Sequence, residues 1–456
     1  MDLKNKRVLV VGLGKSGVAS ALFLESRGAI VTVSDAKPAD QLAKEIPVLL
    51  DHGIAVETGG HGDRTFRGQD LIVVSPGIPA DVDPLAQARA LGEQVIGEIE
   101  LAYEFLPGPI VAITGSNGKT TSTALTSEII TASGFKTLTG GNIGTPAISL
   151  ADQATPESVA VLEVSSFQLE TIRHFRPKVA LILNITPDHL DRHRTLDAYV
   201  NAKARIFENQ TADDFLVLNA EDKTCVALVE RAKAQVYWFS NRKEVERGAF
   251  VWNGEIQFRD GKTQPIMPVS ELSLKGAHNV ENALAAVCAG MLMKCDPAKI
   301  RQAVRNFKAV EHRLEYVATV RGVEYYNDSK ATNVDATMKA LESFPANIHL
   351  ILGGKDKGSD YRVLNSLLRE RVKAAYTIGS AAEKIESQIR GATKIIHAET
   401  LENAIQKAAS SARAGDVILL APACSSFDQF ENYEHRGQVF KQSVASLAQA
   451  ELATAG

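Results

Sequence analysis

Short, continuous apolar runs alternate with longer amphipathic stretches along most of this 456-residue chain. Continuous apolar runs of about four to eight residues are typical of strands that are buried on both faces, as in parallel sheets. Amphipathic stretches with a helical period follow many of these runs. We therefore predict an α/β fold, with strands at residues 7–11, 30–34, 71–74, 110–113, 159–164, 179–183, 215–219, 235–240, 323–326, 349–352, 375–378 and 417–420.

The chain is too long for a single hydrophobic core, so its elements are expected to form several domains. The strand–helix alternation predicts three α/β domains. They are a Rossmann-like domain over residues 1–96, a central P-loop-type ATPase domain with a parallel sheet over 97–308, and a C-terminal Rossmann-like domain over 309–456. Residues 249–274 break the alternation, and their Asn-Gly and Asp-Gly pairs predict β-hairpins.

Composition and charge argue against two classes of function, nucleic-acid binding and membrane insertion. The formal net charge is −4 at pH 7, which is too mild to indicate a nucleic-acid-binding surface. No apolar run is long enough to cross a bilayer, and the first residues lack the apolar core of a signal peptide. The four cysteines show no C-x-x-C spacing, which favours free thiols. We expect a cytoplasmic protein that neither binds nucleic acid nor inserts into membranes.

The first predicted strand leads into a glycine loop, Gly12-Leu13-Gly14-Lys15-Ser16-Gly17, and a second strand ends at Asp35. This βαβ arrangement of G-x-G-x-x-G and a later acid is typical of nucleotide binding, although the motif alone does not identify a dinucleotide. Lys15 adds a cation near any phosphate. The turn at Ser75-Pro76-Gly77 follows another strand and either shares this site or is a plain turn.

A second glycine loop, Gly115-Ser116-Asn117-Gly118-Lys119-Thr120-Thr121, lies between a predicted strand and a predicted helix over 122–133. Backbone N–H groups and the helix dipole would face an anion there, Lys119 would add positive charge, and the Thr120 hydroxyl would ligate Mg²⁺. Ile113 replaces the outer glycine of the longer motif. The alternative is a glycine turn with a solvated lysine.

Three further side chains in the central domain are candidates for the same site. Glu163 interrupts a buried strand, where it either holds Mg²⁺ or faces an edge. Asn142 lies in a glycine-rich loop that is either a ligand contact or a simple connection. Lys203 lies on the apolar stripe of a helix over 196–209, so that its amine either snorkels outward or is buried for chemistry.

In the last domain, polar clusters follow successive predicted strands, at residues 327–333, 353–358 and 422–428. Ligand-binding groups of a doubly wound sheet gather at the carboxyl ends of its strands. Three clusters on one edge therefore predict a binding site.

Several motifs together resemble the Mur ligase family along the whole chain. They are Thr114 to Thr121, Glu163-Val164-Ser165-Ser166, Asp188-His189-Leu190-Asp191, His278-Asn279-x-x-Asn282 and His312-Arg313. Two more, Asn327 to Asn333 and Ser425 to Phe430, resemble the branch of that family that adds D-glutamate.

The resemblance implies an ADP-forming amide ligase of peptidoglycan precursor synthesis. Its substrates would be ATP, UDP-N-acetylmuramoyl-L-alanine and D-glutamate, and an acyl phosphate would be the intermediate. Two Mg²⁺ ions, a carbamate on Lys203 and a monomeric state are also expected.

The same resemblance assigns the site residues. Lys119, His189 and Lys203 would be catalytic, and Thr120, Glu163, His189 and Lys203 would hold metal. ATP would contact Gly115, Ser116, Asn117, Gly118, Lys119, Thr120, Thr121, Asn279, Asn282, Arg313 and Asp328. The UDP precursor would contact Gly14, Lys15, Ser16, Gly17, Asp35, Ser75 and Asn142. D-Glutamate would contact Lys330, Thr332, Lys357, Ser426 and Tyr433, with Lys355 as an alternative to Lys357.

Three other functions are compatible with parts of the chain. A folylpolyglutamate-synthase-like ligase would share the middle and last domains but would leave the first domain unexplained. An NAD(P)-binding oxidoreductase or sensor would use residues 12–35, and a P-loop ATPase switch or motor would use residues 114–121. The switch or motor gives no purpose to the polar clusters after residue 327.

Overall fold

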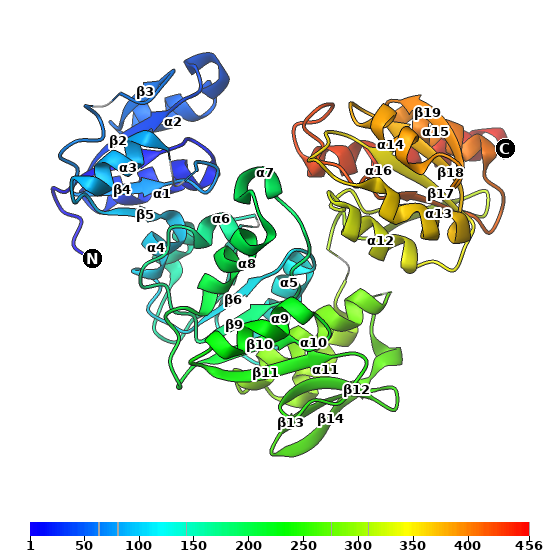
Figure 1. The fold of residues 1–456 in the computed structure, drawn as a ribbon, viewed down its shortest axis with the longest axis horizontal. Helices are drawn as coiled ribbons and strands as arrows, with labels where there is room; N and C mark the ends of the chain where they lie inside the picture. Colours follow the sequence, from blue (N-terminus) through cyan, green and yellow to red (C-terminus); the bar gives the residue numbers. More distant parts are fainter. Residues whose placement is uncertain (63, 80–81, 143, 275, 309, 456) are drawn as a thin grey trace. The chain divides into compact units, whose positions relative to one another are not determined.

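The computed structural model describes residues 1–62, 64–79, 82–142, 144–274, 276–308 and 310–455. Its contacts divide the chain into two compact units. The first is Met1–Ile185, Arg192–Leu272 and Glu281–Asn306; the second is Thr186–Asp191, Ser273–Val280 and Phe307–Gly456. Three sheets are present, as the apolar pattern predicts (Figure 1). The finer division at residues 96/97 and 308/309 stays a prediction.

The N-terminal sheet of the first unit has five parallel strands in the order β3-β2-β1-β4-β5. They are β1 (Arg7–Val11), β2 (Ile30–Asp35), β3 (Ala55–Thr58), β4 (Leu71–Val74) and β5 (Val95–Gly97). Helix α1 (Lys15–Ser26) packs Ala21 and Leu24 on one face, and α3 (Asp83–Ala90) packs Leu85 and Ala88 on the other. Both faces are covered, which explains the continuous apolar strands. The strand order reverses between β1 and β4, so the glycine loop and Ser75 lie at a topological switch point.

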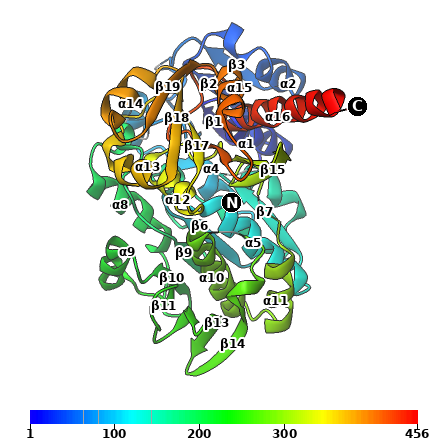
Figure 2. The same cartoon turned by 90° about the vertical axis from the view of Figure 1, so that its right-hand side faces the viewer.

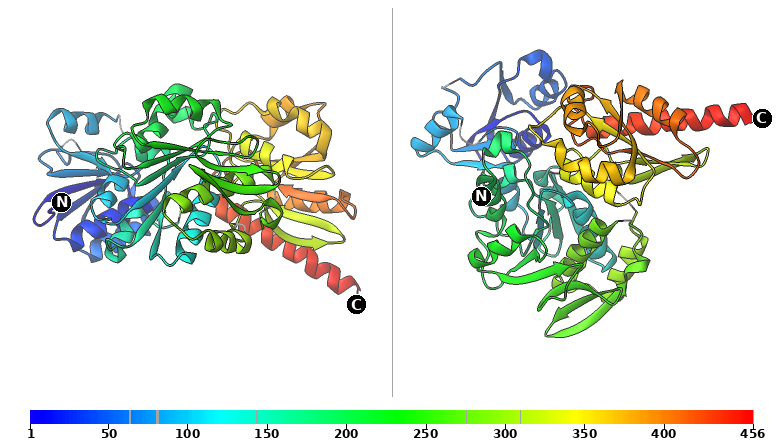
Figure 3. Two further views of the ribbon diagram at one scale, coloured as in Figure 1. Left: turned by 90° about the horizontal axis from the view of Figure 1, so that it is seen from below. Right: turned by 45° about the vertical axis from the view of Figure 1, so that its right-hand side comes forward.

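The central sheet has nine strands in the order β14-β13-β12-β11-β10-β9-β6-β8-β7. Its parallel strands are β6 (Ile110–Thr114), β7 (Thr137–Gly141), β8 (Val159–Glu163), β9 (Val179–Ile182), β10 (Phe215–Asn219), β11 (Gln235–Ser240) and β12 (Gly248–Trp252). The hairpins are confirmed, because β13 (Glu255–Asp260) and β14 (Lys262–Pro268) extend one edge in antiparallel pairing (Figure 3). They end at residue 268 rather than 274, where a short 3-10 turn follows.

Helix boundaries near the central glycine loop differ from the prediction. Helix α5 (Lys119–Ala132) begins three residues earlier than expected, because Gly118 adopts the left-handed conformation (φ 84°) and starts the helix at once. Helix α8 (Leu196–Ala204) is shorter than expected and continues as a 3-10 turn to Phe207. Asn279 lies within the first turn of α10 (Ala277–Leu292), which begins two residues before it.

The sheet of the second unit has six strands in the order β15-β16-β20-β17-β18-β19. They are β15 (Glu315–Val320), β16 (Val323–Asn327), β17 (Ile348–Gly353), β18 (Val372–Ile378), β19 (Lys394–Glu399) and β20 (Val417–Leu420), and only β15 pairs antiparallel. Helices α12 (Val334–Glu342), α13 (Asn365–Arg371) and α14 (Ala382–Ile389) cover one face. Helices α15 (Leu401–Ser411) and α16 (Tyr433–Ala455) cover the other, and α16 continues past the sheet (Figure 2).

Among the described helices, none combines the length and the apolar character that a membrane crossing requires.

Candidate functional site

The central glycine loop is held in shape by one asparagine. Asn184, just after β9, accepts hydrogen bonds from the N–H groups of Ser116 (at its carbonyl, 2.9 Å) and Asn117 (at Oδ1, 2.8 Å). Its Nδ2 donates to the Asn117 carbonyl (3.1 Å). A Cβ at Gly118 would overlap Oδ1 of Asn282, so the predicted ATP-site residue Asn282 packs directly on the loop. Asn184 was missed from the sequence, although its place immediately after a buried strand was a usable signal.

The Lys119 ammonium lies against the loop rather than in solvent. Its Nζ donates to the carbonyls of Gly115 and Ser116, each at 2.9 Å. Lys119 is also the first residue of α5, where the helix dipole favours an anion. A cation, backbone N–H groups and a helix N-terminus therefore converge here, which is the chemistry that a phosphate requires.

Glu163 is buried, with 1% of its surface exposed, which excludes the edge-facing alternative. Its strand β8 lies between β6 and β7. Oε2 accepts from the Thr120 hydroxyl (2.9 Å) and Oε1 accepts from Nδ2 of Asn142 (2.9 Å). A carboxylate, a hydroxyl and an amide oxygen are hard ligands that suit Mg²⁺, so these residues fit the expected metal. The structure thus brings together three side chains that the sequence proposed separately.

Lys203 points inward and does not snorkel. It is 1% exposed, and its Nζ donates to the Gly115 carbonyl (2.8 Å) and lies 3.5 Å from Oγ1 of Thr114. The ring centroid of Tyr199 lies 4.6 Å from the same nitrogen. The amines of Lys119 and Lys203 therefore share one carbonyl oxygen, an arrangement in which like charges oppose each other.

A second layer behind the loop contains residues that sequence analysis did not assign. The hydroxyls of Ser116 and Tyr199 lie 3.1 Å apart, and Tyr199 packs against the ring of His193. His193 is buried and its Nε2 lies 2.9 Å from Oγ of Ser166. His193 therefore supports the loop indirectly, through Tyr199.

His189 lies in the second unit and has a positive φ of 53°. Its backbone N–H donates to Oδ1 of Asp188 (2.9 Å). The role of His189 as a metal ligand stays a prediction.

The first glycine loop is locked by an acid and a serine. Asp35 accepts from the N–H groups of Leu13 (2.6 Å) and Lys37 (2.8 Å), and Ser75 donates to the Gly12 carbonyl (2.8 Å). A Cβ at Gly17 would overlap that carbonyl, so glycine is required there. Ser75 is therefore more than a plain turn residue. Gly14 and Lys15 are exposed at the start of α1, and Ser16 is half-buried, which leaves these three accessible to a ligand.

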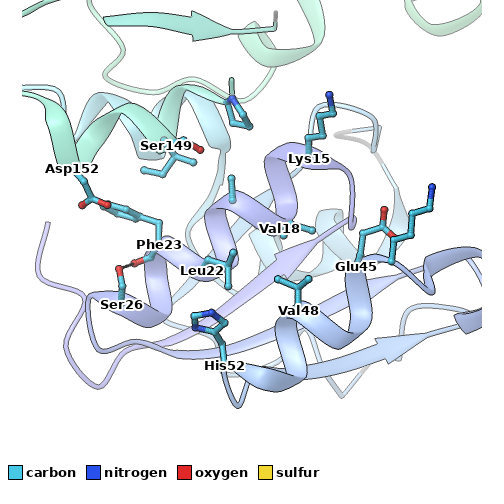
Figure 4. Close-up of a pocket in the computed structure, with 14 residues that line it drawn as sticks. Lys15, Val18, Leu22, Phe23, Ser26, Glu45, Val48, His52, Ser149 and Asp152 are labelled. Carbon is cyan, nitrogen blue, oxygen red and sulfur yellow. Dashed lines mark hydrogen bonds between the residues drawn. The ribbon is translucent and has the colours of Figure 1, made fainter. Parts of the chain in front are cut away.

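A pocket of about 700 Å³ runs along α1, between α2 (Glu45–Asp51) and the turn η2 (Ala147–Gln153) (Figure 4). Val18, Leu22 and Phe23 form its apolar wall. Of the predicted UDP contacts, Lys15 lines this pocket, so the pocket borders the predicted nucleotide site at that residue.

The acceptor candidates lie in the second unit, at the carboxyl ends of the adjacent strands β16, β20 and β17. The Lys330 ammonium lies 3.7 Å from the ring centroid of Tyr433, and Ser426 is buried. Lys357 is half-buried and its Nζ lies 3.9 Å from Oδ1 of Asp188. Lys355 is exposed and its backbone pairs with Ser425. The choice between Lys357 and Lys355 as the acceptor contact stays a prediction.

The remaining ATP candidates of the second unit are Asn279, Arg313 and the buried acid Asp328. Asp328 accepts from the N–H of Leu314 (3.2 Å), and burial raises its pKa to about 6 against the opposing charge of Arg313. Asn279 is buried. These contacts give Asp328 a structural link to the His312-Arg313 segment, whereas its predicted ribose contact stays a prediction.

Family profiles match almost the whole chain. They are described as "Mur ligase MurD-like, N-terminal domain" (residues 6–97), "Mur ligase middle domain" (113–290) and "Mur ligase, glutamate ligase domain" (312–424).

Curated relatives match end to end. A protein of Koribacter versatilis is 63% identical over 99% of this chain and 100% of its own, and one of Acidobacterium capsulatum is 60% identical over 97% of each. Both are named UDP-N-acetylmuramoylalanine–D-glutamate ligase.

Solved structures share the fold at lower identity. A pseudomurein peptide ligase type C of Methanothermus fervidus (TM-score 0.62, 22% identity) covers 97% of this chain with 100% of its own. A UDP-N-acetylmuramate-alanine ligase of Thermotoga maritima (TM-score 0.60, 20% identity) has the same coverage.

Proposed function

Since this chain belongs to the Mur ligase family, we propose that it joins D-glutamate to UDP-N-acetylmuramoyl-L-alanine at the expense of ATP, releasing ADP and phosphate. The observation that carries this proposal is the convergence of Lys119, Thr120, Glu163 and Lys203 on one glycine loop. The names of the full-length relatives support the choice of substrates. The reaction would supply peptidoglycan precursors in the cytoplasm, with the enzyme acting as a monomer.

ATP would bind with its phosphates at Gly115 to Thr121. Lys119 is positioned to balance charge on the β- and γ-phosphates. Asn282, on α10, packs on this loop and would contact the bound nucleotide. The other nucleotide contacts would be Asn279, Arg313 and Asp328.

Thr120, Glu163, His189 and Lys203 would hold two Mg²⁺ ions. Bound magnesium would neutralise negative charge between the γ-phosphate and the approaching carboxylate. A carbamate on Lys203 is supported by the site itself, because it would replace one of two cations on the Gly115 carbonyl with an anionic oxygen ligand. A buried lysine at this place would otherwise oppose metal binding.

The precursor's uridine diphosphate would lie at the first glycine loop, with Gly14, Lys15 and Ser16 in contact and with Gly17, Asp35 and Ser75 shaping the loop. Asn142 would contact the muramoyl part while it also holds Glu163.

D-Glutamate would bind at Lys330, Thr332, Lys357, Ser426 and Tyr433. Two cations suit its two carboxylates.

The proposed chemistry has two steps. A carboxylate oxygen of the precursor attacks the γ-phosphorus and ADP leaves. The amine of D-glutamate then attacks the acyl carbon of the resulting acyl phosphate, the C–O bond to phosphate breaks, and the nitrogen loses its proton to solvent.

A coupled assay of ADP release tests the proposal with UDP-N-acetylmuramoyl-L-alanine and a panel of amino acids. We expect release that depends on D-glutamate and is at least ~100-fold slower with L-glutamate, D-aspartate or L-alanine. ADP formation that is indifferent to the amino acid would reject the ligase assignment.

A further inference from the structure

Arg436 is a fully buried arginine in the first turn of α16, with no exposed surface. Among the described residues it takes part in no ion pair, although Arg is rarely buried without a carboxylate partner. Asp428 is the acid whose charge acts on it, but that carboxylate accepts a hydrogen bond from the N–H of Ser380 (2.9 Å). Burial lowers the pKa of Arg436 to about 10, so the group remains charged at neutral pH.

The guanidinium donates instead to two loops that carry acceptor candidates. Nε and Nη2 donate to Oγ (3.0 Å) and the carbonyl (2.8 Å) of Ser329, which directly precedes Lys330. Nη2 and Nη1 donate to the carbonyls of Cys424 (3.2 Å) and Ser425 (3.4 Å), which precede Ser426. One planar group therefore joins the loop after β16 to the loop after β20.

The loop after β17 reaches the same guanidinium. A Cβ at Gly354 would lie 3.1 Å from Nη1 of Arg436, and would overlap the Ser425 carbonyl. Lys355 and Ser425 also exchange backbone hydrogen bonds (2.9 and 3.2 Å). All three polar loops at this edge of the sheet thus pack on or beside Arg436.

The same contacts fix Tyr433, one turn earlier on α16. Oγ of Ser329 accepts from Arg436 and donates to the Tyr433 carbonyl (2.8 Å), and the Tyr433 ring lies under the Lys330 ammonium. The chain therefore bears the cost of desolvating a guanidinium at the point where the acceptor candidates from β16, β20 and α16 meet.

We propose that Arg436 is a positioning residue for the acceptor amino acid: its guanidinium sets the spacing of the loops that present Lys330, Ser426 and Lys357. This inference rests on the proposed ligase function. Arg436 does not contact the substrate. The spacing of the loops depends on the several N–H donors of the Arg436 guanidinium and not on its charge alone. A lysine ammonium has a single nitrogen and does not span the carbonyls of Ser329 and Cys424.

The test is steady-state kinetics of Arg436→Lys and Arg436→Met, with the KM determined separately for D-glutamate, ATP and the UDP precursor. We expect the KM for D-glutamate to rise at least ~10-fold in both variants, while the other two KM values stay within about twofold. Arg362→Met is the matched control, because Arg362 is exposed in the same unit and pairs only with Asp360 at the surface. It should behave as wild type.

Wild-type KM for D-glutamate in Arg436→Lys, or an equal rise of all three KM values, would overturn the inference. Ser329→Ala provides a second, milder variant if Arg436→Met does not fold, because it keeps the guanidinium and removes only the Ser329 hydroxyl, which accepts from Nε and donates to the Tyr433 carbonyl. Its KM for D-glutamate should rise about threefold or more, and an unchanged value would contradict the proposal. The proposed function fails separately, if wild-type ADP release does not depend on D-glutamate.

Discussion

The first unit contains two glycine loops of the same construction, each joining a parallel strand to a helix, and they are stabilised by different groups. The loop after β1 is locked by Asp35 and Ser75, whose polar atoms bond to its backbone. The loop after β6 is surrounded by two lysines and a buried glutamate. These contacts fix the backbone of the first loop, whereas those of the second loop bring charged side chains together. Two loops with similar glycine motifs therefore differ in the charge of their neighbours.

The largest loss of activity should come from a substitution beside the loop after β6, where the lysines and Glu163 gather. Lys203→Ala should reduce turnover by at least ~1,000-fold with little change in melting temperature, because it removes the expected anionic metal ligand. ADP release measures turnover, and added bicarbonate or a small carboxylate should restore part of it.

Asn201→Ala is a control on the exposed side of the same helix, where Asn201 bonds only to Arg231 at the surface (2.9 Å). It should retain full activity. Unchanged activity in Lys203→Ala would refute the metal-ligand role and remove the contrast between the loops.

Glu163→Gln should have the next largest effect. The change keeps the shape of the side chain but removes its charge, so the Mg²⁺ concentration for half-maximal activity should rise ~10-fold or more and turnover should fall ~100-fold. A Mg²⁺ titration of ADP release measures both. An unaltered magnesium requirement would show that Glu163 only braces Thr120 and Asn142.

Asp35→Asn tests the role of the loop after β1. The amide retains one oxygen acceptor where the carboxylate serves two N–H groups, so the loop should loosen. We expect the KM for the UDP precursor to rise about five- to tenfold while the KM for ATP and the Mg²⁺ requirement stay unchanged. An effect of Asp35→Asn on the Mg²⁺ requirement would break the distinction between the two loops.

Glu98 at the start of α4 (Glu98–Tyr103) links the sheets that carry the two loops, and its substitution should leave turnover unchanged. Its Oε1 accepts from the N–H of Ile148 (2.8 Å), and burial raises its pKa to about 7. The folded chain therefore binds this proton more tightly than the unfolded chain. The contribution of Glu98 to the free energy of unfolding is full below pH ~4.5 and is lost as the pH rises through 7, by about 3 kcal/mol at most.

Glu98→Gln should accordingly flatten the dependence of the melting temperature on pH between 5 and 8, as followed by circular dichroism. An identical pH dependence in both proteins would show that Glu98 does not titrate in this range.

Much of this organisation was predictable from the sequence, for identifiable reasons. Strands buried on both faces, such as β4 and β20, appear as pure apolar runs, and β1 does so after Arg7; all three were predicted at their observed limits. The strands β3, β15 and β19 were missed because they lie at sheet edges and mix polar with apolar residues. The candidate site residues were proposed from local motifs, because phosphate binding requires a local motif.

Residues that act through long-range contacts were missed. Asn184 and His193 support the central loop from 67 and 27 residues away from their partners Asn117 and Ser166. Arg436 bonds to Ser329 and Cys424, which lie 107 and 12 positions before it. Nothing in the local pattern of these residues indicates a partner, because sequence spacing carries no information on contacts that the fold creates. Lys203 was an exception, because its place on an apolar stripe was itself the signal.

In the proposed reaction, ATP bound at the loop after β6 transfers a phosphoryl group to the precursor's carboxylate. The most direct measurement uses UDP-N-acetylmuramoyl-L-alanine with ¹⁸O in both oxygens of its carboxylate, followed by mass analysis of the released phosphate. We expect one ¹⁸O atom in each phosphate, because the attacking carboxylate oxygen leaves with phosphorus. Unlabelled phosphate released alongside the amide product would contradict it.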